Sequence, residues 1–475
     1  MKRLLIFITI ITLSLFLFSC KDGGGSSTGK MVEWYELSKD ANYDGSKVTI
    51  RFWHRMGEQN QNVLQGWIKE FNEIYPNIEV IEENVAGDYD ALADKISYAI
   101  TAGDYPDISE SYPDHIARYA QGDAPLALNN FISNPNIGFS QAEIDDFLVG
   151  LWNEGSSYDN EGTILSMPFT KSSEALFYNK TYFDKHGYTA PKTWDELFAI
   201  AEDIKAREPE SYPFGYDSEG NFFITASEQW GAPYTGYDAN GKGQVLFNND
   251  LSKDMVRYFK DKVDRGLMLT RMLNGEAYTS DIMKLGERAG EKNLYMYVGS
   301  TGGARYAYGT EAVFDTGYRV GVAPVPVKSM DNRKQIQQGP NINLFKKSNE
   351  QQMIASWLFV KFMLTPEHTA EFALQSGYAP VRHSAYETQI WNDYVAKIKN
   401  EPTTMAEAQA KTIKEAIDMF RNNDDIFFTS AVFNLSSKTR NEVGALLVKI
   451  LSYSGDNIDK YINDEYEDSF DFIVN

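Results

Sequence analysis

Residues 48–80, VTIRFWHRMGEQNQNVLQGWIKEFNEIYPNIEV, contain the strand–helix–strand order that decides the fold. Apolar Val48, Ile50 and Phe52 alternate with polar residues, which predicts a strand at the start of this stretch. Over 63–75 the apolar residues fall on one face of a helix, and a Pro-Asn pair ends that helix before a second strand over 78–85. A further helical segment follows over 89–99. Because such units cross over right-handed, we expect an α/β fold with a mostly parallel sheet.

Capping signals predict helices further along the chain. Ser140 is followed three residues later by Glu143, and Ser348 by Gln351, the spacing of a capping box. Thr365 precedes a proline, the residue preferred at the first helical position. Helical periodicity also predicts a helical C-terminal tail over 404–421, 438–452 and 457–466.

The net charge of the chain indicates which classes of partner are disfavoured. Among 475 residues, 45 Lys and Arg stand against 67 Asp and Glu, a formal net charge of -22. Binding to nucleic acid begins with neutralisation of phosphates by cations, so nucleic acid is disfavoured as a partner. Adhesion to anionic lipid is disfavoured for the same reason. The acidity indicates a self-repelling surface, and we expect a monomer.

The N-terminus has the pattern of an export signal. Lys2 and Arg3 precede an apolar run that ends at Cys20, the one cysteine of the chain. The tetrapeptide LFSC resembles a bacterial lipobox, where cleavage leaves a lipidated cysteine. We therefore expect a signal peptide over 1–19 and a lipidated Cys20 with a flexible linker over 20–46, which includes the Gly/Ser stretch DGGGSSTG. The expected location is extracytoplasmic and membrane-anchored, on the periplasmic side or the cell surface. The alternative is a secretory signal with an incidental cysteine.

The sequence contains no convincing catalytic or metal motif. HExxH, GxSxG, Walker and dinucleotide-binding patterns are absent. Residues 40–45 match the first half of a calcium loop, but Arg51 stands where the loop needs a bidentate glutamate. The preferred interpretation of 40–45 is a turn. We expect no enzyme activity, no metal and no cofactor.

Three stretches together resemble the family 1 extracellular solute-binding proteins, which serve ABC importers of sugars and glycerol phosphates. They are 48–80, 168–204 and a discontinuous stretch over 320–382 that includes VGVAPVPVK, QGPNINLFKKS and FALQSGYAPVR. The resemblance implies a two-lobe periplasmic-binding-protein type II fold with a ligand cleft between the lobes. It places 47–167 and 299–345 in lobe one, 174–298 and 346–475 in lobe two, and the first crossing at 169–173. Lobes of this kind close around ligand by hinge motion.

The resemblance also implies a set of ligand-binding residues. The chain has 29 Tyr, 28 Phe and 8 Trp; an aromatic ring covers the C–H face of a sugar, although ordinary core packing is the alternative for each ring. Glu110 and Tyr112 follow a strand, at whose carboxyl end ligands gather in open α/β sheets. The implied residues are Trp53, His54, Tyr89, Asp90, Glu110, Tyr112, Ser172, Trp230, Ser300, Asn341, Tyr378 and Arg382.

One departure from the family concerns phosphate. Relatives that bind glycerol phosphates carry an arginine in the C-terminal segment, since a bidentate arginine suits phosphate. The corresponding stretch here, 430–434, has none, and Arg440 is out of register. This favours a neutral mono- or oligosaccharide, with phosphorylated polyols as the alternative.

The leading hypothesis is a lipid-anchored protein that captures a sugar or related polyol and delivers it to the permease subunits of an ABC transporter. A secreted glycoside hydrolase is the main alternative, and it requires two carboxyl groups roughly 5–10 Å apart across the cleft. A third reading is an adhesin or sensor lipoprotein, which would carry an exposed apolar patch away from the cleft.

Overall fold

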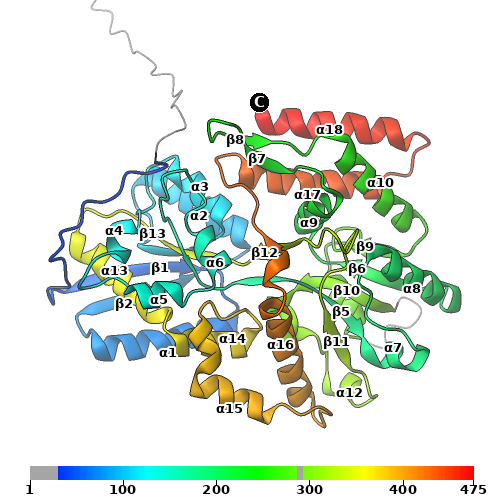
Figure 1. Ribbon diagram of the computed structural model, residues 1–475, viewed down its shortest axis with the longest axis horizontal. Helices are drawn as coiled ribbons and strands as arrows, with labels where there is room; N and C mark the ends of the chain where they lie inside the picture. The colour runs from blue at the N-terminus through cyan, green and yellow to red at the C-terminus, as the bar shows by residue number, and fades with distance from the viewer. Residues whose placement is uncertain (1–29, 286–292) are drawn as a thin grey trace, which may run out of the picture.

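The computed structural model describes residues 30–285 and 293–475. Two α/β lobes lie side by side, lobe one on the left of Figure 1 and lobe two on the right. Each lobe is built around its own sheet, with helices packed against it. The α/β two-lobe architecture that the sequence predicts is confirmed.

The sheet of lobe one has the strand order β2-β1-β3-β13-β4. β1 pairs in parallel with β2 and β3, whereas β13 is antiparallel to β3 and β4, so this sheet is only partly parallel. The strands are β1 (Val48–His54), β2 (Ile78–Asn84), β3 (Ile108–Ser111), β4 (Met167–Pro168) and β13 (Asn341–Leu344). The helices are α1 (Glu58–Ile74), α2 (Tyr89–Ala102), α3 (Pro113–Ala120), α4 (Asn129–Ile132), α5 (Gln141–Asp145), α6 (Val149–Glu154), α13 (Glu350–Met363) and α14 (Pro366–Ser376).

The sheet of lobe two has the order β14-β12-β5-β10-β6-β9, and β11 also pairs with β5. Its strands are β5 (Ser172–Asn179), β6 (Tyr212–Tyr216), β9 (Met268–Thr270), β10 (Leu294–Ser300), β11 (Val320–Ala323), β12 (Gln335–Gln338) and β14 (Phe427–Phe428), and a separate ribbon joins β7 (Thr235–Tyr237) to β8 (Gly243–Val245). The helices are α7 (Lys180–His186), α8 (Trp194–Arg207), α9 (Glu219–Trp230), α10 (Asp250–Asp264), α11 (Thr279–Met283), α12 (Glu311–Phe314), α15 (Gln389–Lys397), α16 (Met405–Arg421), α17 (Ser436–Ser452) and α18 (Ile458–Val474), with 3₁₀ turns η2 (Thr301–Tyr306), η3 (His383–Glu387) and η4 (Asp424–Ile426).

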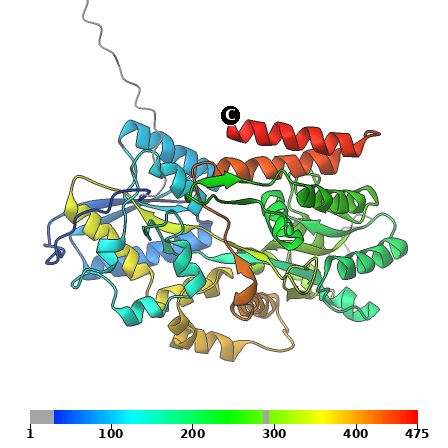
Figure 2. The ribbon, with the colours of Figure 1, turned by 45° about the horizontal axis from the view of Figure 1, so that its top comes forward.

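The predicted helix starts agree with the structure with one exception. Ser140 and Glu143 form a complete capping box at α5, and Thr365 caps α14. α13 is capped by Asn349 instead of Ser348, one residue later than predicted. The helical C-terminal tail is present as α16, α17 and α18, and the last two lie along each other at the edge of lobe two (Figure 2).

The chain crosses between the lobes at two adjacent segments and again after α14, where it passes from lobe one to α15 of lobe two. It leaves β4 of lobe one and enters β5 of lobe two across 169–171, and it returns from β12 to β13 across Gly339 and Pro340. The two segments run side by side, since the Thr170 amide donates to the carbonyl of Pro340 at 3.2 Å. The first predicted crossing, at 169–173, is therefore consistent with the sheet topology.

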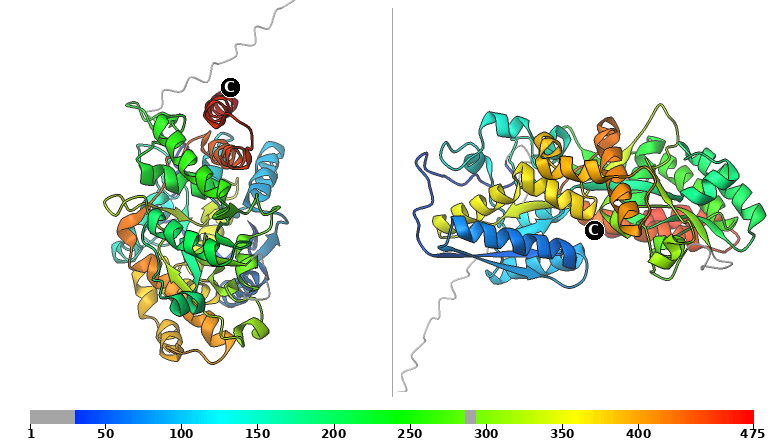
Figure 3. Two further views of the ribbon diagram at one scale, coloured as in Figure 1. Left: turned by 90° about the vertical axis from the view of Figure 1, so that its right-hand side faces the viewer. Right: turned by 90° about the horizontal axis from the view of Figure 1, so that it is seen from below.

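The lobe boundaries predicted for the second half of the chain are wrong. Most of 299–345 belongs to lobe two, because β11 and β12 both pair with β5. Residues 346–381 instead belong to lobe one, where α13 buries Ile354 and Trp357 in the core beneath the sheet. Figure 3 shows α13 alongside α1 on this side of the molecule. The family order of segments did not reveal which sheet each strand joins.

The N-terminal linker is also shorter than predicted. Signal residues 1–19 and Cys20 lie outside the described residues. From residue 30 onward the chain packs on lobe one: Val32 is buried, and the Trp34 indole N–H donates to Thr163 at 3.0 Å. Apolar side chains in this segment therefore join the folded body. Within the described residues, none of the helices combines the length and apolarity needed to cross a membrane.

Candidate ligand-binding cleft

Two adjoining cavities of about 560 and 610 Å³ lie between the lobes. They form one continuous cleft, because seven residues line both of them. These are Tyr89 and Tyr112 of lobe one, Asp217, Ser218, Asn221 and Arg271 of lobe two, and Gln338 beside the crossing. Both lobes therefore contribute side chains to the same space.

Tyr89 and Tyr112 form the lobe-one wall at the carboxyl ends of the parallel strands. Tyr89 opens α2 after β2, and Tyr112 follows β3, which brings the rings together edge to face at 5.1 Å between centroids. Glu110 lies behind them: it accepts hydrogen bonds from the Tyr89 hydroxyl at 3.4 Å and from Thr170 at 3.1 Å. Burial raises the pKa of Glu110. The wall is thus connected to the crossing segment through one buried carboxyl.

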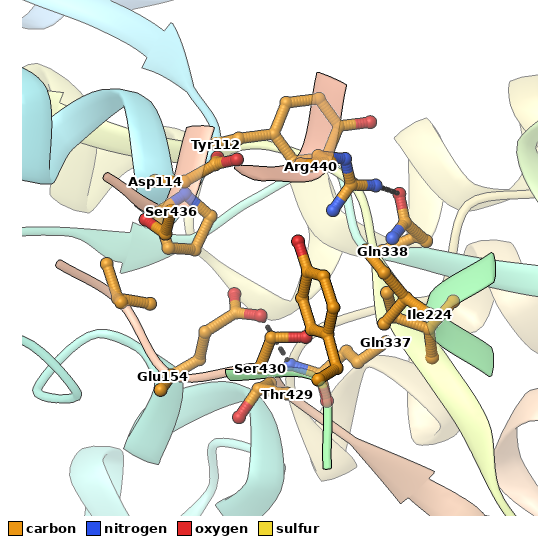
Figure 4. A pocket seen from close by; sticks show the side chains of 16 residues that line it. Tyr112, Asp114, Glu154, Ile224, Gln337, Gln338, Thr429, Ser430, Ser436 and Arg440 are labelled. Atoms are coloured by element: carbon orange, nitrogen blue, oxygen red, sulfur yellow. Dashed lines mark hydrogen bonds between the residues drawn. The ribbon is translucent and has the colours of Figure 1, made fainter. Parts of the chain in front are cut away.

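Arginines from separate elements form part of the lobe-two wall. Arg440, near the start of α17, donates to Gln338 at 3.1 Å and also to Asn221. Its guanidinium lies 5.6 Å from the ring centroid of Tyr112, so it spans the space between the lobes (Figure 4). Arg271 follows β9 and stacks over Tyr278 at 4.6 Å. The cleft therefore offers cationic hydrogen-bond donors beside aromatic rings.

α17 also contacts lobe one directly. Asn441 donates to Asp90 at 3.2 Å, and Asp90 bonds His115 at 3.1 Å. Hydrogen bonds from His115 and Asn441 and the positive charge of Arg440 lower the pKa of Asp90. This helix therefore carries side chains that reach from lobe two to the opposite wall.

Two carboxyl groups on lobe two differ in how well they are paired. Asp217 accepts hydrogen bonds from the Thr279 amide and hydroxyl and from the Ser280 amide. Glu174 accepts one from the Tyr216 hydroxyl at 2.5 Å on Oε2, while its Oε1 has no hydrogen-bond partner among the residues that the structure describes. Burial raises the pKa of Glu174 to about 7.

A smaller cavity of about 50 Å³ lies beyond Gln338 and Arg440 (Figure 4). Its floor holds a buried ion pair at the crossing between Glu154 and Lys171. Lys171 also donates to the Gly339 carbonyl at 2.7 Å, and Gln337 donates to Glu154 at 3.0 Å. Polar contacts of the crossing segments are thus concentrated directly beneath the cleft.

Half of the predicted ligand-binding residues line the cleft. Tyr89, Asp90, Tyr112, Ser172, Ser300 and Tyr378 are all in its lining. They come from both lobes, and Tyr378 of lobe one lies against Gly302 of lobe two, where an added Cβ would be 2.8 Å from the ring. Their contact with ligand stays a prediction.

The other half are corrected by the structure, because each lies outside the lining of both cavities. Trp53 is buried with Lys95 over its ring at 4.2 Å, and His54 is buried against Glu82 at 2.8 Å. Glu110 lies behind Tyr89, as described above. These three side chains support the wall from within lobe one.

The remaining corrections are structural contacts far from, or beneath, the cleft. Trp230 packs on Tyr258 and Phe259 in the lobe-two core, with 5.4 Å between centroids in each pair. Asn341 is buried at the crossing, where it accepts from Lys171 at 3.1 Å. Arg382 is buried in an ion pair with Asp146 and stacks on Phe147.

Sequence reasoning missed Arg271, Arg440 and Glu174. Arg440, which the sequence places out of register with the family's phosphate-binding arginine, nevertheless lines both the 560 Å³ cavity and the small one. Periodicity predicts its helix but not the neighbour that the helix faces. Glu174 did leave a signal: it is a lone carboxylate in the otherwise uncharged strand SSEALFYN.

No group of three or more His, Cys, Asp or Glu side chains in the described parts of the chain is arranged to hold a metal ion.

Comparisons with known proteins define the class. The fold is that of the GacH receptor of Streptomyces glaucescens, with a TM-score of 0.69 and 20% identity over 90% of this chain and 98% of that one. The fold is also similar to that of UgpB from Mycobacterium tuberculosis in complex with glycerophosphocholine, with a TM-score of 0.68 and 17% identity. The molecule thus shares the two-lobe fold of these proteins.

Comparison of the sequence identifies the family of this protein. The family described as bacterial extracellular solute-binding protein matches residues 66–400, and the chain belongs to that family. Among its relatives, the maltotriose-binding protein of Pyrococcus abyssi is 24% identical over 78% of this chain and 73% of its own. The sn-glycerol-3-phosphate-binding periplasmic protein UgpB of Escherichia coli (strain K12) is 23% identical over 72% of this chain and 76% of its own. The family resemblance seen in the sequence is confirmed.

Proposed function

We propose that this protein captures a sugar or related polyol in the cleft and delivers it to the permease subunits of an ABC transporter. The observation that carries the proposal is a continuous cleft whose walls come from both lobes of a member of the solute-binding family. Within the described residues, six tyrosines line the 610 Å³ cavity: Tyr89, Tyr112, Tyr278, Tyr297, Tyr306 and Tyr378. Aromatic faces beside polar side chains suit a ligand with C–H faces and hydroxyls.

The ligand class includes phosphorylated polyols as well as neutral saccharides. The absence of an arginine from 430–434 favours a neutral sugar by itself, but Arg440 and Arg271 both line the cleft. The relative named for maltotriose supports a neutral saccharide, and the relative named for sn-glycerol 3-phosphate supports a phosphorylated polyol.

A thermal-shift panel of maltose, maltotriose, sn-glycerol 3-phosphate and glycerophosphocholine tests the function. A ligand that binds the folded state raises the free energy of unfolding by RT ln(1 + [L]/Kd), and the melting temperature rises with it. We expect at least one of these probes to raise the melting temperature progressively as its concentration increases. A flat response across all four would count against sugar or polyol capture, and conversion of a bound saccharide to shorter products would favour the hydrolase instead.

Anchoring through a lipid on Cys20 is part of the proposal. The supporting pattern is a cationic start, an apolar run and the tetrapeptide LFSC. Replacing Cys20 by Ala should move the protein from the membrane fraction to the soluble fraction while leaving ligand affinity unchanged. Retention of the variant in the membrane fraction would exclude Cys20 as the anchor.

A further inference from the structure

Glu174 combines burial with incomplete pairing in the wall of the cleft. It is the third residue of β5, directly after the first crossing, and is 1% exposed. It lines the 610 Å³ cavity together with Ser172 and Tyr297. Oε1 has no partner among the described residues, and a buried acceptor without a hydrogen bond is unfavourable. A ligand atom that donates to Oε1 would therefore bind favourably, because it provides the hydrogen bond that no donor in the described residues provides.

The contrast with Asp217 shows why Glu174 is singled out. Both carboxyl groups line the same cavity. Both oxygens of Asp217 are occupied, since Oδ1 accepts from Thr279 and Oδ2 accepts from Ser280 at 3.2 Å. The hydrogen bonds of Asp217 are thus satisfied within the fold. Glu174 has one oxygen, Oε1, that can accept a hydrogen bond from a molecule in the cleft.

We propose that Glu174 binds the captured ligand directly, accepting a hydrogen bond from a ligand hydroxyl on Oε1. The assignment rests on the proposed function, since it concerns the same cleft and the same polyol class of ligand. It makes Glu174 a specificity-determining residue: a ligand that lacks a donor at this position leaves the acceptor unpaired. Sites built to bond a substrate hydroxyl reject analogues without it strongly.

The groups around Glu174 decide its charge. The titratable or charged ones are Tyr216 from β6 and Arg440 from α17, with Asp217, Arg271, Lys284 and the six tyrosines named above lining the same cavity. The uncharged neighbours are Asn221 and Thr225 of α9, Ser300 of β10 and Gln335 of β12. Burial raises the pKa of Glu174 to about 7, against the opposing effects of the Tyr216 hydrogen bond, the nearby Asn221 amide and the Arg440 charge.

This pKa makes ligand affinity depend on pH. A ligand hydroxyl that donates to Oε1 favours the ionised carboxyl, so binding releases a proton and affinity rises with pH. With a free-state pKa of about 7, binding to the ionised form alone gives about 30-fold weaker affinity at pH 5.5 than at pH 8.5.

The test is calorimetric titration of the full chain and of Glu174→Gln with the four probes named above, at both pH values. The readout is the difference between the two proteins, which cancels any titration of the probe itself. We expect the affinity of the wild type to rise about 30-fold from pH 5.5 to pH 8.5. The affinity of Glu174→Gln should not rise in this way, and at pH 8.5 it should be weaker than that of the wild type. Equal pH dependence in both proteins would overturn the assignment while leaving the proposed function intact. Failure of the wild type to bind any probe would overturn both.

Two further variants keep the test decisive if Glu174→Gln does not fold. Tyr216→Phe retains the carboxyl but removes the donor to Oε2, so the midpoint of the pH dependence should move to higher pH; an unmoved midpoint contradicts the assignment. Glu228→Gln is the matched control on α9, because burial also raises the pKa of Glu228, but it lies outside the lining of both cavities. Its pH profile should match that of the wild type.

Discussion

Single side chains in this cleft fall into those that face the cavity and those that hold them in place. Tyr89 faces it, while Glu110 behind it bonds the Tyr89 hydroxyl and the Thr170 hydroxyl of the crossing. Glu174 faces it from the other lobe with one acceptor that no donor among the described residues fills. The same residue type therefore has different roles in the two walls, and burial and pairing distinguish them.

The raised pKa of Glu174 predicts a measurable effect on stability. Because the folded-state pKa of about 7 exceeds the ordinary value of 4.5, the folded protein binds this proton more tightly. The resulting stability is fully present below pH 4.5 and is lost as pH rises to about 7. The free energy of unfolding should fall over this range by on the order of 3 kcal/mol more in the wild type than in Glu174→Gln.

Urea unfolding of both proteins at several pH values measures this difference. Glu58→Gln, an exposed carboxyl at the start of α1, serves as the surface control. A constant stability difference between wild type and Glu174→Gln from pH 4.5 to 7.5 would show that the carboxyl titrates in the ordinary range.

At the scale of elements, the paired crossing segments join the two sheets and carry the most constrained contacts. Gly339 has φ +92, and a Cβ there would lie 2.0 Å from the Thr170 carbonyl oxygen of the neighbouring segment. Next to it, Lys171 is buried against Glu154 and the Gly339 carbonyl. Motion between the lobes has to be accommodated by these residues together with the third crossing after α14.

Gly339→Ala should lower the free energy of unfolding by more than the cost of placing an alanine at positive φ. A non-glycine residue at positive φ costs roughly 1–2 kcal/mol, and the contact with Thr170 adds to this. Gly45→Ala is the matched control, since Gly45 has φ +84 and nothing within 4 Å of the added Cβ. Urea denaturation of both variants compares the losses. Equal losses would mean that the crossing shifts to accept the methyl group without further cost.

The buried ion pair gives a second prediction at this scale. Lys171→Met leaves Glu154 buried without its cation, so we expect a loss of about 3–5 kcal/mol in the free energy of unfolding. The double variant Lys171→Met/Glu154→Gln removes both charges and should recover more than half of that loss. A double-mutant cycle by urea denaturation measures the coupling; a double variant as unstable as the single one would show that the pairing contributes little.

At the scale of the whole molecule, the cleft couples the two lobes. Arg440 and Asn441 of α17 reach Tyr112 and Asp90 on the opposite wall. A ligand shifts the equilibrium between open and closed arrangements only if it binds the closed one more tightly. Contacts from both walls supply that difference in affinity.

Ligand binding should therefore make the molecule more compact. Small-angle scattering with the panel ligand that gives the largest thermal shift should record a smaller radius of gyration at saturation. Tyr112→Ala removes one aromatic wall and should reduce both the affinity and the change in radius. Saturable binding with an unchanged radius would indicate capture on one lobe without closure.

Local patterns in the sequence determined much of this protein. The alternation over 48–54, the helical face of α1 and the capping residues of α5 and α14 predicted their elements, because each depends on neighbours a few residues away. The order of three family segments predicted the two-lobe fold. The position of Tyr112 after a strand predicted its place in the cleft wall.

Only the tertiary structure decided which lobe each later segment joins and which side chains meet in the cleft. β11 and β12 join the lobe-two sheet, and Trp230 turns into the core, because pairing and packing depend on partners distant in sequence. Arg440 reaches Gln338 only through the register of α17. The pairing of Glu174 likewise depends on β6. Chain periodicity specifies which face of an element is buried, whereas the partner of that face is set by long-range packing.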